Sequence, residues 1–221
     1  MIQSFIWEFP LTASFATFMV LLYPIVILFF PFLVDSYFIA TPGELEPINW
    51  VLSTFFHGSG AHLLSNMLFL LFLGRVVEYR VGKQKWLLYY FMAGIISVLG
   101  DAFVRGLIFG DRTPIVGASG AISGLAAAAT LLSPFQFPVT KRKTIPFPVF
   151  LIGWMMLYSD FTNLFARDQV AHWAHLGGFF SVFLTGYLLS AEERKLIRQG
   201  FLLNFAFFTL TVILLFFINN R

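Results

Sequence analysis

Long stretches without a charged residue alternate along this chain with short stretches in which charges cluster. A helix needs about 20 apolar residues to cross the hydrocarbon core of a membrane. The two shortest stretches reach that length if one extends through Asp101 and the other to about Phe165. The uncharged stretches are 9–34, 47–74, 86–100, 113–140, 144–159, 169–191 and 199–220. They predict seven helices, at residues 13–33, 61–79, 85–104, 116–133, 146–164, 170–189 and 200–219.

The composition indicates what surrounds these helices. Hydrophobic residues make up 58% of the 221 residues and charged residues only 11%, whereas a typical soluble domain is about 25% charged. So few charges could not cover a water-soluble globule, and so many apolar residues exclude a disordered chain. We therefore expect an all-α polytopic membrane protein in a lipid bilayer. The net charge of +3 does not indicate a nucleic-acid partner, and the lack of Cys excludes disulfides and thiol catalysis.

The basic residues predict the orientation. Ten of the fourteen Lys and Arg residues lie in the loops after the second, fourth and sixth expected helices. Because cytoplasmic loops carry the excess of Lys and Arg, these loops should be cytoplasmic. The N-terminus is then cytoplasmic and the C-terminus external, in the inner membrane if the source is a bacterium. The ten residues are Arg75, Arg80, Lys83, Lys85, Lys141, Arg142, Lys143, Arg194, Lys195 and Arg198.

Histidines inside or beside the expected helices mark a candidate site. An ionisable side chain is costly within a bilayer and by default indicates function. A single histidine could equally be a packing residue that is hydrogen-bonded to a neighbour. Four that gather near one face favour function. They are His57, His62, His172 and His175.

Three expected helices bring polar side chains to one depth. Ser119 and His175 each follow a charged residue of the outer loops by seven positions, which places each roughly 10 Å below that charge. His62 and Asn66, four residues apart, share one face of the second helix and enter from the same side. The sequence thus predicts a polar cluster at a shallow depth below the outer surface.

Small residues surround Ser119, from Gly117 through Ala129. A helix with so little bulk to offer lipid should be central, with other helices packed closely on it. Ser119 could then be one more small residue in a packing seam. The histidine expected at matching depth favours another interpretation, because serine becomes a nucleophile when an adjacent base takes its proton.

Three short motifs lie on the second, fourth and sixth expected helices. They read His62-Leu63-Leu64-Ser65-Asn66, Gly117-Ala118-Ser119-Gly120 and Ala174-His175-Leu176-Gly177-Gly178. In this combination and order they resemble the rhomboid intramembrane serine proteases, although a lone GxSG would be a weak signal. The resemblance covers about residues 50 to 190. It implies a six-helix rhomboid-like catalytic domain at 1–198, followed by a seventh transmembrane helix at 199–221.

The resemblance implies roles for the matching polar positions. Ser119 matches the nucleophile, and His175 matches the general base because it precedes Gly178 by three positions, as the family's histidine does. His62 and Asn66 match the side chains that stabilise the oxyanion together with the backbone N–H of Ser119. No cofactor or metal is implied.

Structural positions also match, with three departures. Gly117, Gly120 and Gly178 correspond to helix-packing glycines, and Glu78 and Arg80 to structural residues at the inner end of the second helix. The departures concern packing and the first loop, and they remove no catalytic group. Val182 replaces a packing glycine, Ser123 stands where an aromatic residue often stacks on the histidine, and Trp50 is followed by Val51 rather than Arg.

The implied reaction is peptide-bond hydrolysis by a Ser–His dyad. His175 would take the proton as Ser119 attacks the scissile carbonyl, and would return it to the leaving amine. We expect no third carboxylate, because nothing in the sequence places Asp101 or Asp160 against His175. Water should enter from the outer face. The substrate should be a transmembrane helix of another protein, unwound near the outer boundary by residues such as Gly or Pro.

Other interpretations predict different chemistry. A non-catalytic rhomboid-like protein that binds membrane clients would lack the nucleophile or the base. A haem or metal site built from His62, His172 and His175 is disfavoured by the absence of carboxylates within the spans and of an HExxH motif. A transporter is disfavoured because the sequence has no charged pair at mid-membrane. An aspartyl protease is disfavoured because the sequence has no GxGD motif. The role of His172 stays open between site partner, water path and packing.

Overall fold

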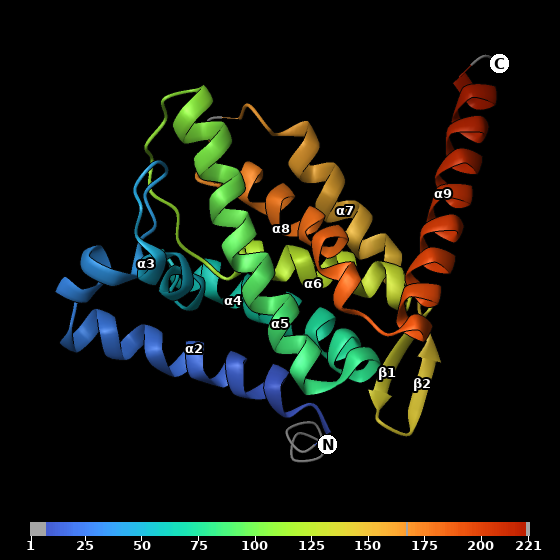
Figure 1. Cartoon of the computed structure of the whole chain (residues 1–221), viewed down its shortest axis with the longest axis horizontal. Helices are drawn as coiled ribbons and strands as arrows, with labels where there is room; N and C mark the ends of the chain where they lie inside the picture. Colours follow the sequence, from blue (N-terminus) through green and yellow to red (C-terminus); the bar gives the residue numbers. More distant parts are fainter. Residues whose placement is uncertain (1–7, 167, 220–221) are drawn as a thin grey trace.

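The computed structural model describes residues 8–166 and 168–219, which are mostly helical (Figure 1). The ends of the expected domain ranges, 1–7 and 220–221, lie outside the described residues. The helices are α2 (Pro10–Phe29), α3 (Pro47–Leu52), α4 (Gly60–Phe69), α5 (Arg75–Asp101), α6 (Ser119–Leu132), α7 (Val149–Thr162), α8 (His172–Thr185) and α9 (Ala191–Asn219). Short π- or 3₁₀-helical turns lie at Val34–Phe38, Ser53–Phe55, Leu70–Gly74, Ala102–Ile108 and Gly186–Leu188.

The all-α expectation misses a short hairpin. Strands β1 (Gln136–Thr140) and β2 (Lys143–Pro146) pair antiparallel between α6 and α7. They lie in the loop that carries Lys141 to Lys143. The sequence pattern predicts no strand in this loop.

Helices overlap all seven expected ranges, with shifted boundaries. The stretches Pro10–Phe29 and Gly60–Ile108 are long and apolar enough to cross a membrane, whereas α6 and α7 are shorter apolar helices. Within Gly60–Ile108 the helical backbone is broken at Gly82, where φ is +75°, a conformation that glycine adopts without steric cost. This break separates the second and third expected helices. Helix α9 begins at Ala191, so the expected domain boundary after residue 198 falls inside a continuous helix.

Helix α6 is the centre of the fold. All of its residues from Gly120 to Leu132 are buried, and it packs on α5, α7, α8 and α9 (Figure 1). The prediction that a helix of small residues is central is therefore confirmed. The physical reason is that helices carrying Gly and Ala allow neighbouring backbones to approach closely.

Helices α6 and α8 make their closest approach at two glycines. A Cβ atom added to Gly178 would lie 2.0 Å from the carbonyl oxygen of Gly120, closer than any real contact. One turn along α6, a Cβ on Gly124 would lie 3.1 Å from the Ser181 hydroxyl oxygen. Ser181 therefore continues the seam where the motif was expected to carry a second glycine, and Val182 is buried in the core instead.

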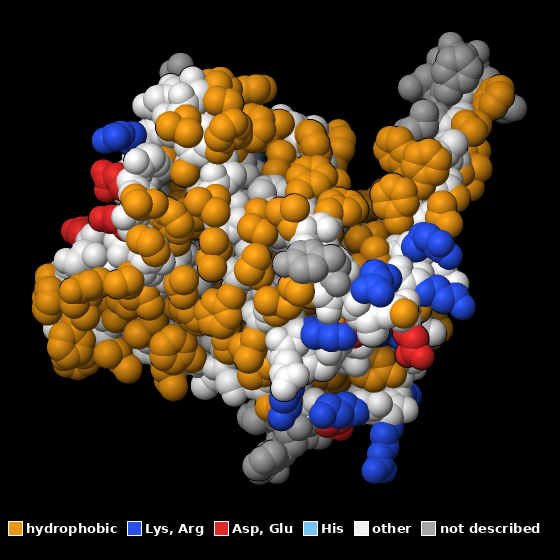
Figure 2. Space-filling view, in the orientation of Figure 1, with side chains coloured by type: hydrophobic (Ala, Val, Ile, Leu, Met, Phe, Trp, Pro, Cys, Tyr) orange, Lys and Arg blue, Asp and Glu red, His pale blue; other side chains and the backbone are white. Residues whose placement is uncertain are grey.

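Basic and hydrophobic side chains occupy different parts of the molecular surface. Lys and Arg side chains gather at one end, over the hairpin and the start of α9, while hydrophobic side chains cover most of the visible face (Figure 2). Large apolar residues such as Leu28 and Leu107 are more than 70% exposed. Exposed apolar surface on this scale favours contact with lipid. Ser119 begins α6 at the end opposite the hairpin, about 20 Å along the helix axis from Leu132.

Two residues of α5 clamp the basic end of the fold. The Glu78 carboxylate accepts hydrogen bonds from the backbone N–H groups of Leu11 (3.1 Å) and Thr12 (2.9 Å), and from the Thr12 hydroxyl (2.8 Å). These N–H groups belong to the first turn of α2, where no intrahelical acceptor exists. Arg80 donates to the Ser133 hydroxyl at 3.0 Å and so ties α5 to the end of α6.

Replacing the buried carboxylate tests this clamp. Glu78→Gln should lower the midpoint of thermal unfolding in detergent by about 5 °C or more, because a hydrogen bond to a charged group contributes about 1.5–3 kcal/mol and each 1 kcal/mol shifts the midpoint by about 2–4 °C in a chain of this size. The exposed Glu192→Gln is the matched control and should leave the midpoint unchanged. Equal midpoints for both variants would contradict the clamp.

Candidate active site

A non-helical segment that contains Gly117 leads directly into α6, whose first residue is Ser119. Gly117 has φ of +132° and donates its N–H to the carbonyl oxygen of Ser53 at 2.9 Å. A Cβ on Gly117 would lie 2.7 Å from Cε1 of the His62 ring. Gly117 thus lies before the helix, against a histidine, and not in a seam between helices. A side chain at this position would both strain the backbone and displace His62.

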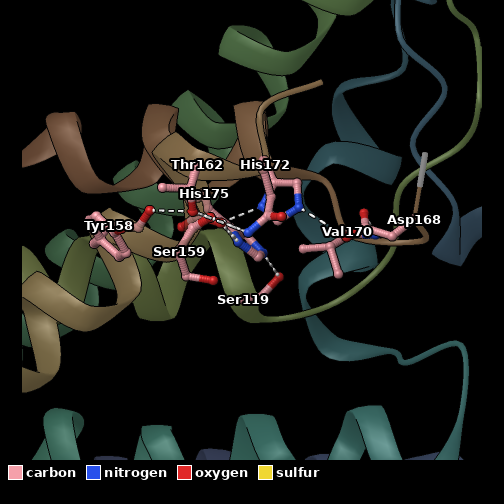
Figure 3. A network of polar contacts seen from close by, with 10 residues as sticks. Ser119, Tyr158, Ser159, Thr162, Asp168, Val170, His172 and His175 are labelled. Carbon is pink, nitrogen blue, oxygen red and sulfur yellow. Dashed lines mark hydrogen bonds and ion pairs between the residues drawn. The ribbon is translucent and has the colours of Figure 1, made fainter. Parts of the chain in front are cut away.

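Ser119 and His175 are in direct contact. The hydroxyl oxygen of Ser119 lies 2.8 Å from Nε2 of His175 (Figure 3). Ser119 is the first residue of α6, and His175 lies one turn into α8. Both side chains are half-buried. A hydroxyl at this distance from an imidazole nitrogen can pass its proton to the ring.

A carboxylate also contacts His175, contrary to the expectation from the sequence. Oδ1 of Asp160 lies 2.8 Å from Nδ1 of His175, so the prediction of no third carboxylate is wrong. Helices α7 and α8 follow one another through the loop 163–171. Asp160 lies just before that loop and His175 just after it, which brings both to the same level. The depth comparison that paired Ser119 with His175 could have found Asp160 as well.

His172 lies between two carboxylates. Its Nδ1 is 2.7 Å from the same Asp160 oxygen, and its Nε2 is 3.3 Å from Oδ2 of Asp168. His172 and Asp160 are buried, whereas Asp168 is exposed in the loop before α8. The backbone N–H of Val170 donates to Asp168 and holds the pKa of that carboxyl below its ordinary value. Asp168 therefore faces His172 as a carboxylate at neutral pH.

The two expected oxyanion side chains, His62 and Asn66, make different contacts. His62 lies against the backbone just before Ser119, as the contact with Gly117 shows. The side-chain amide of Asn66 instead donates to the backbone carbonyl of His62 at 3.0 Å. The Ser119 N–H belongs to the first turn of α6, where backbone N–H groups have no intrahelical acceptor and attract negative charge.

Buried space and polar groups lie next to the nucleophile. A cavity of ≈ 20 Å³ is lined by Gly117, Ser119 and Gly120 together with residues of α5 and α8, which is room for about one water molecule. The ring of His57 is buried 5.1 Å from that of His62, and neither of its nitrogens has a hydrogen-bond partner among the described residues. Ser123 is buried one turn further along α6, with its hydroxyl likewise unpaired within that part of the chain.

One group of side chains offers metal-ligand atoms. Asp160, His172 and His175 each present one such atom, all within 4.8 Å of one another. The sequence-based argument that carboxylates are absent near these histidines is therefore wrong, although His62 is not part of the group. The separations of 2.7 and 2.8 Å are hydrogen-bond distances, and ligands at about 2.0–2.1 Å from a tetrahedral zinc ion lie further apart. The distances therefore favour hydrogen bonds among Asp160, His172 and His175 over coordination of a metal ion.

Comparison with known proteins identifies the family. The family model of the rhomboid domain matches residues 44–192, more than half of the chain. The chain belongs to the rhomboid family. Membership in this family implies an integral membrane protein.

Rhomboid relatives occur in plants, bacteria and animals. The chain is 31% identical over 147 residues to RHOMBOID-like protein 4 of Arabidopsis thaliana, which covers 66% of this chain and 34% of that protein. It is 30% identical over 156 residues to Presenilin-associated rhomboid-like protein A, mitochondrial, of Danio rerio, with 69% and 40% covered. It is 34% identical over 108 residues to Rhomboid protease AarA of Providencia stuartii, with 44% and 37% covered. The chain thus spans little more than a third of the length of these relatives.

The glycine contact that sets the distance between α6 and α8 can be tested directly. Because a shift of about 1 Å between reacting groups costs about 100-fold in rate, Gly178→Ala should lower any fluorophosphonate labelling of Ser119 by about that factor. Gly186→Ala is the matched control. A Cβ there meets nothing within 4 Å, so its labelling should equal that of the wild type. Wild-type labelling of Gly178→Ala would show that the close approach does not align the two residues.

Proposed function

We propose that this rhomboid-family protein is an intramembrane serine endopeptidase in which Ser119 is the nucleophile and His175 the general base. The observation that carries the proposal is the 2.8 Å contact between the Ser119 hydroxyl and Nε2 of His175. The hydroxyl lies at the start of a helix and beside a cavity with room for about one water molecule. A non-catalytic client-binding protein is the alternative, and it has no use for this contact.

The proposed reaction follows from these positions. His175 takes the proton as the Ser119 oxygen attacks the scissile carbonyl carbon, and returns it to the leaving amine. The carbonyl oxygen becomes an oxyanion that accepts from the Ser119 backbone N–H and from His62. Asn66 joins them once its amide leaves the His62 carbonyl. Water then attacks the acyl-enzyme, with His175 as its base, and restores the free serine.

The proposed architecture is a six-span core at residues 1–198 followed by a seventh span at 199–221. The last helix attaches to the core through the Asn204 side chain, which donates to the Thr130 carbonyl at 3.2 Å and accepts from Trp154 Nε1 at 2.9 Å. Phe207 and Phe208 also contact Phe150 and Trp154 of α7, and the C-terminal part of α9 leans away from the other helices (Figure 1). Its many exposed Phe side chains, such as Phe205 and Phe208, suit a lipid environment.

The proposed substrates are transmembrane helices of other proteins, cut near the outer face of the membrane. The scissile carbonyl must leave its i to i−4 hydrogen bond before Ser119 can reach it. Substrates should therefore carry Gly or Pro near the cleaved bond. We expect water to reach Ser119 from the outer face, because the hairpin that carries Lys141 to Lys143 lies at the other end of α6 (Figure 1).

The nucleophile can be tested with two serines of one helix. Ser119→Ala should abolish cleavage of a single-span test substrate, because no other group can form the acyl-enzyme, while the thermal midpoint stays within a few degrees. Ser123→Ala is the control, since the buried Ser123 hydroxyl has no hydrogen-bond partner among the described residues, and its effect should be far milder. Full activity of Ser119→Ala would refute the protease assignment and favour client binding.

The two histidines of α8 separate the base from its neighbour. His175→Ala should remove activity, whereas His172→Ala should leave a measurable fraction, because the contact between Ser119 and His175 remains. The reverse result would assign the general base to His172.

The orientation can be tested independently of the chemistry, since the native chain has no Cys. A Cys in place of Glu44 should react with an impermeant thiol reagent in intact cells, whereas a Cys in place of Arg142 should react only after lysis. An inverted pattern would move Ser119 from about 10 Å to about 20 Å below the outer surface of a 30 Å core. It would also reverse the side from which water and substrate enter.

A further inference from the structure

We propose that Asp160 is a positioning residue for His175. The Asp160 carboxylate keeps the proton of the neutral His175 ring on Nδ1, so that Nε2 is free to receive the proton of Ser119. This rests on the proposed function and deepens it: the site is a chain of four groups, Ser119, His175, Asp160 and His172, and not an isolated Ser–His pair. Figure 3 shows the network around Ser119, His175 and His172.

The first step concerns the tautomer of His175. A neutral imidazole carries one proton, on either nitrogen, and an ionised carboxylate can only accept hydrogen bonds. With Oδ1 of Asp160 2.8 Å from Nδ1, the proton lies on Nδ1. The lone pair of Nε2 then faces the Ser119 hydroxyl, 2.8 Å away. In the other tautomer the proton would lie on Nε2. The Ser119 hydroxyl oxygen could then only accept a hydrogen bond from His175, and the serine would keep its proton.

The second step concerns the charge that develops during attack. When Nε2 receives the serine proton, His175 becomes a cation. Asp160 is buried with only 6% of its surface exposed, so its negative charge acts on that cation with little screening by water. In Ser–His–Asp triads of unrelated folds, the carboxylate holds the tautomer and stabilises the imidazolium in this same way.

The third step concerns what holds Asp160. The same oxygen that faces His175 is 2.7 Å from Nδ1 of His172, whose Nε2 is 3.3 Å from the Asp168 carboxylate. Both carboxylates only accept, so His172 makes both contacts when it carries a proton on each nitrogen. Its positive charge then compensates the buried carboxylate. The role of His172 that the sequence left open is thus assigned as anchor of Asp160.

Two substitutions of similar size separate positioning from packing. Asp160→Leu fills the site but removes the acceptor, whereas Asp160→Asn keeps an oxygen that can accept from Nδ1. The matched control is Ser159→Leu, which alters the adjacent, exposed residue of α7. For each variant we would measure the thermal midpoint, kcat and KM on a single-span substrate, and the rate of fluorophosphonate labelling.

The expected result is a graded loss confined to the chemical step. Asp160→Leu should lower kcat and the labelling rate by about 10²–10⁴-fold, the usual contribution of general-base catalysis, with KM within about twofold of wild type. Asp160→Asn should lose less than Asp160→Leu, because its amide oxygen can still accept from Nδ1. Ser159→Leu should match the wild type.

Nitrogen-15 NMR of the histidine side chains supplies a readout that packing would not move. The chain has four histidines, and the His175 signals are identified by their loss in His175→Gln. Wild type and Asp160→Asn should show a protonated Nδ1 and a bare Nε2 on His175, and Asp160→Leu should show the reverse.

Two outcomes would overturn the assignment of Asp160. One is wild-type kcat and labelling in Asp160→Leu. The other is a loss of activity in Asp160→Leu while Nδ1 of His175 stays protonated. If Ser119→Ala and His175→Ala are inactive in the same experiments, either outcome leaves the protease assignment intact. Cleavage by Ser119→Ala would instead refute the proposed function itself.

Discussion

The closeness of α6 to α8 is the constraint on which the rest of the site depends. Gly178 lies so near the Gly120 carbonyl that a single methyl group would collide with it, and Ser119 and His175 flank this crossing on their two helices. The short side chain of Ser119 meets the His175 ring at hydrogen-bond distance beside this crossing. The small residues of α6 thus allow the close packing that brings Ser119 and His175 together.

The polar groups gather where three helices begin or end. Ser119 starts α6, Asp160 lies near the end of α7, and His172 and His175 lie in the first turns of α8. Helix ends supply unpaired backbone groups, so polar side chains and an oxyanion can be accommodated there at less cost than mid-helix in an apolar environment. The buried carboxylate is tolerable because two imidazoles share one of its oxygens.

At the opposite end of the molecule, hydrogen bonds connect helices to one another. Glu78 caps α2, Arg80 reaches the end of α6, and Asn204 ties α9 to the same region. Glu78 joins α2 to α5, whereas Arg80 and Asn204 contact Ser133 and Thr130 at the end of α6, about 17–21 Å along the helix axis from Ser119. Substitutions at these contacts should lower the stability of the fold more than the reactivity of Ser119. Substitutions in the first turn of α8 should affect both.

The sequence by itself determined the helical architecture, the central place of α6 and the common depth of Ser119 and His175, because uncharged stretches, small-residue content and helical rise are local properties. The choice of His175 over His172 came from the resemblance to the family. The sequence missed the hairpin between α6 and α7, and it rejected Asp160 as a partner of His175. Only the tertiary structure decided that contact, the anchoring of Asp160 by His172 and the hydrogen bond that turns the Asn66 amide toward its own helix. These depend on how α7 and α8 are rotated about their axes. Rotation is set by the packing of whole helix faces, such as Gly178 on Gly120, and no short motif records it.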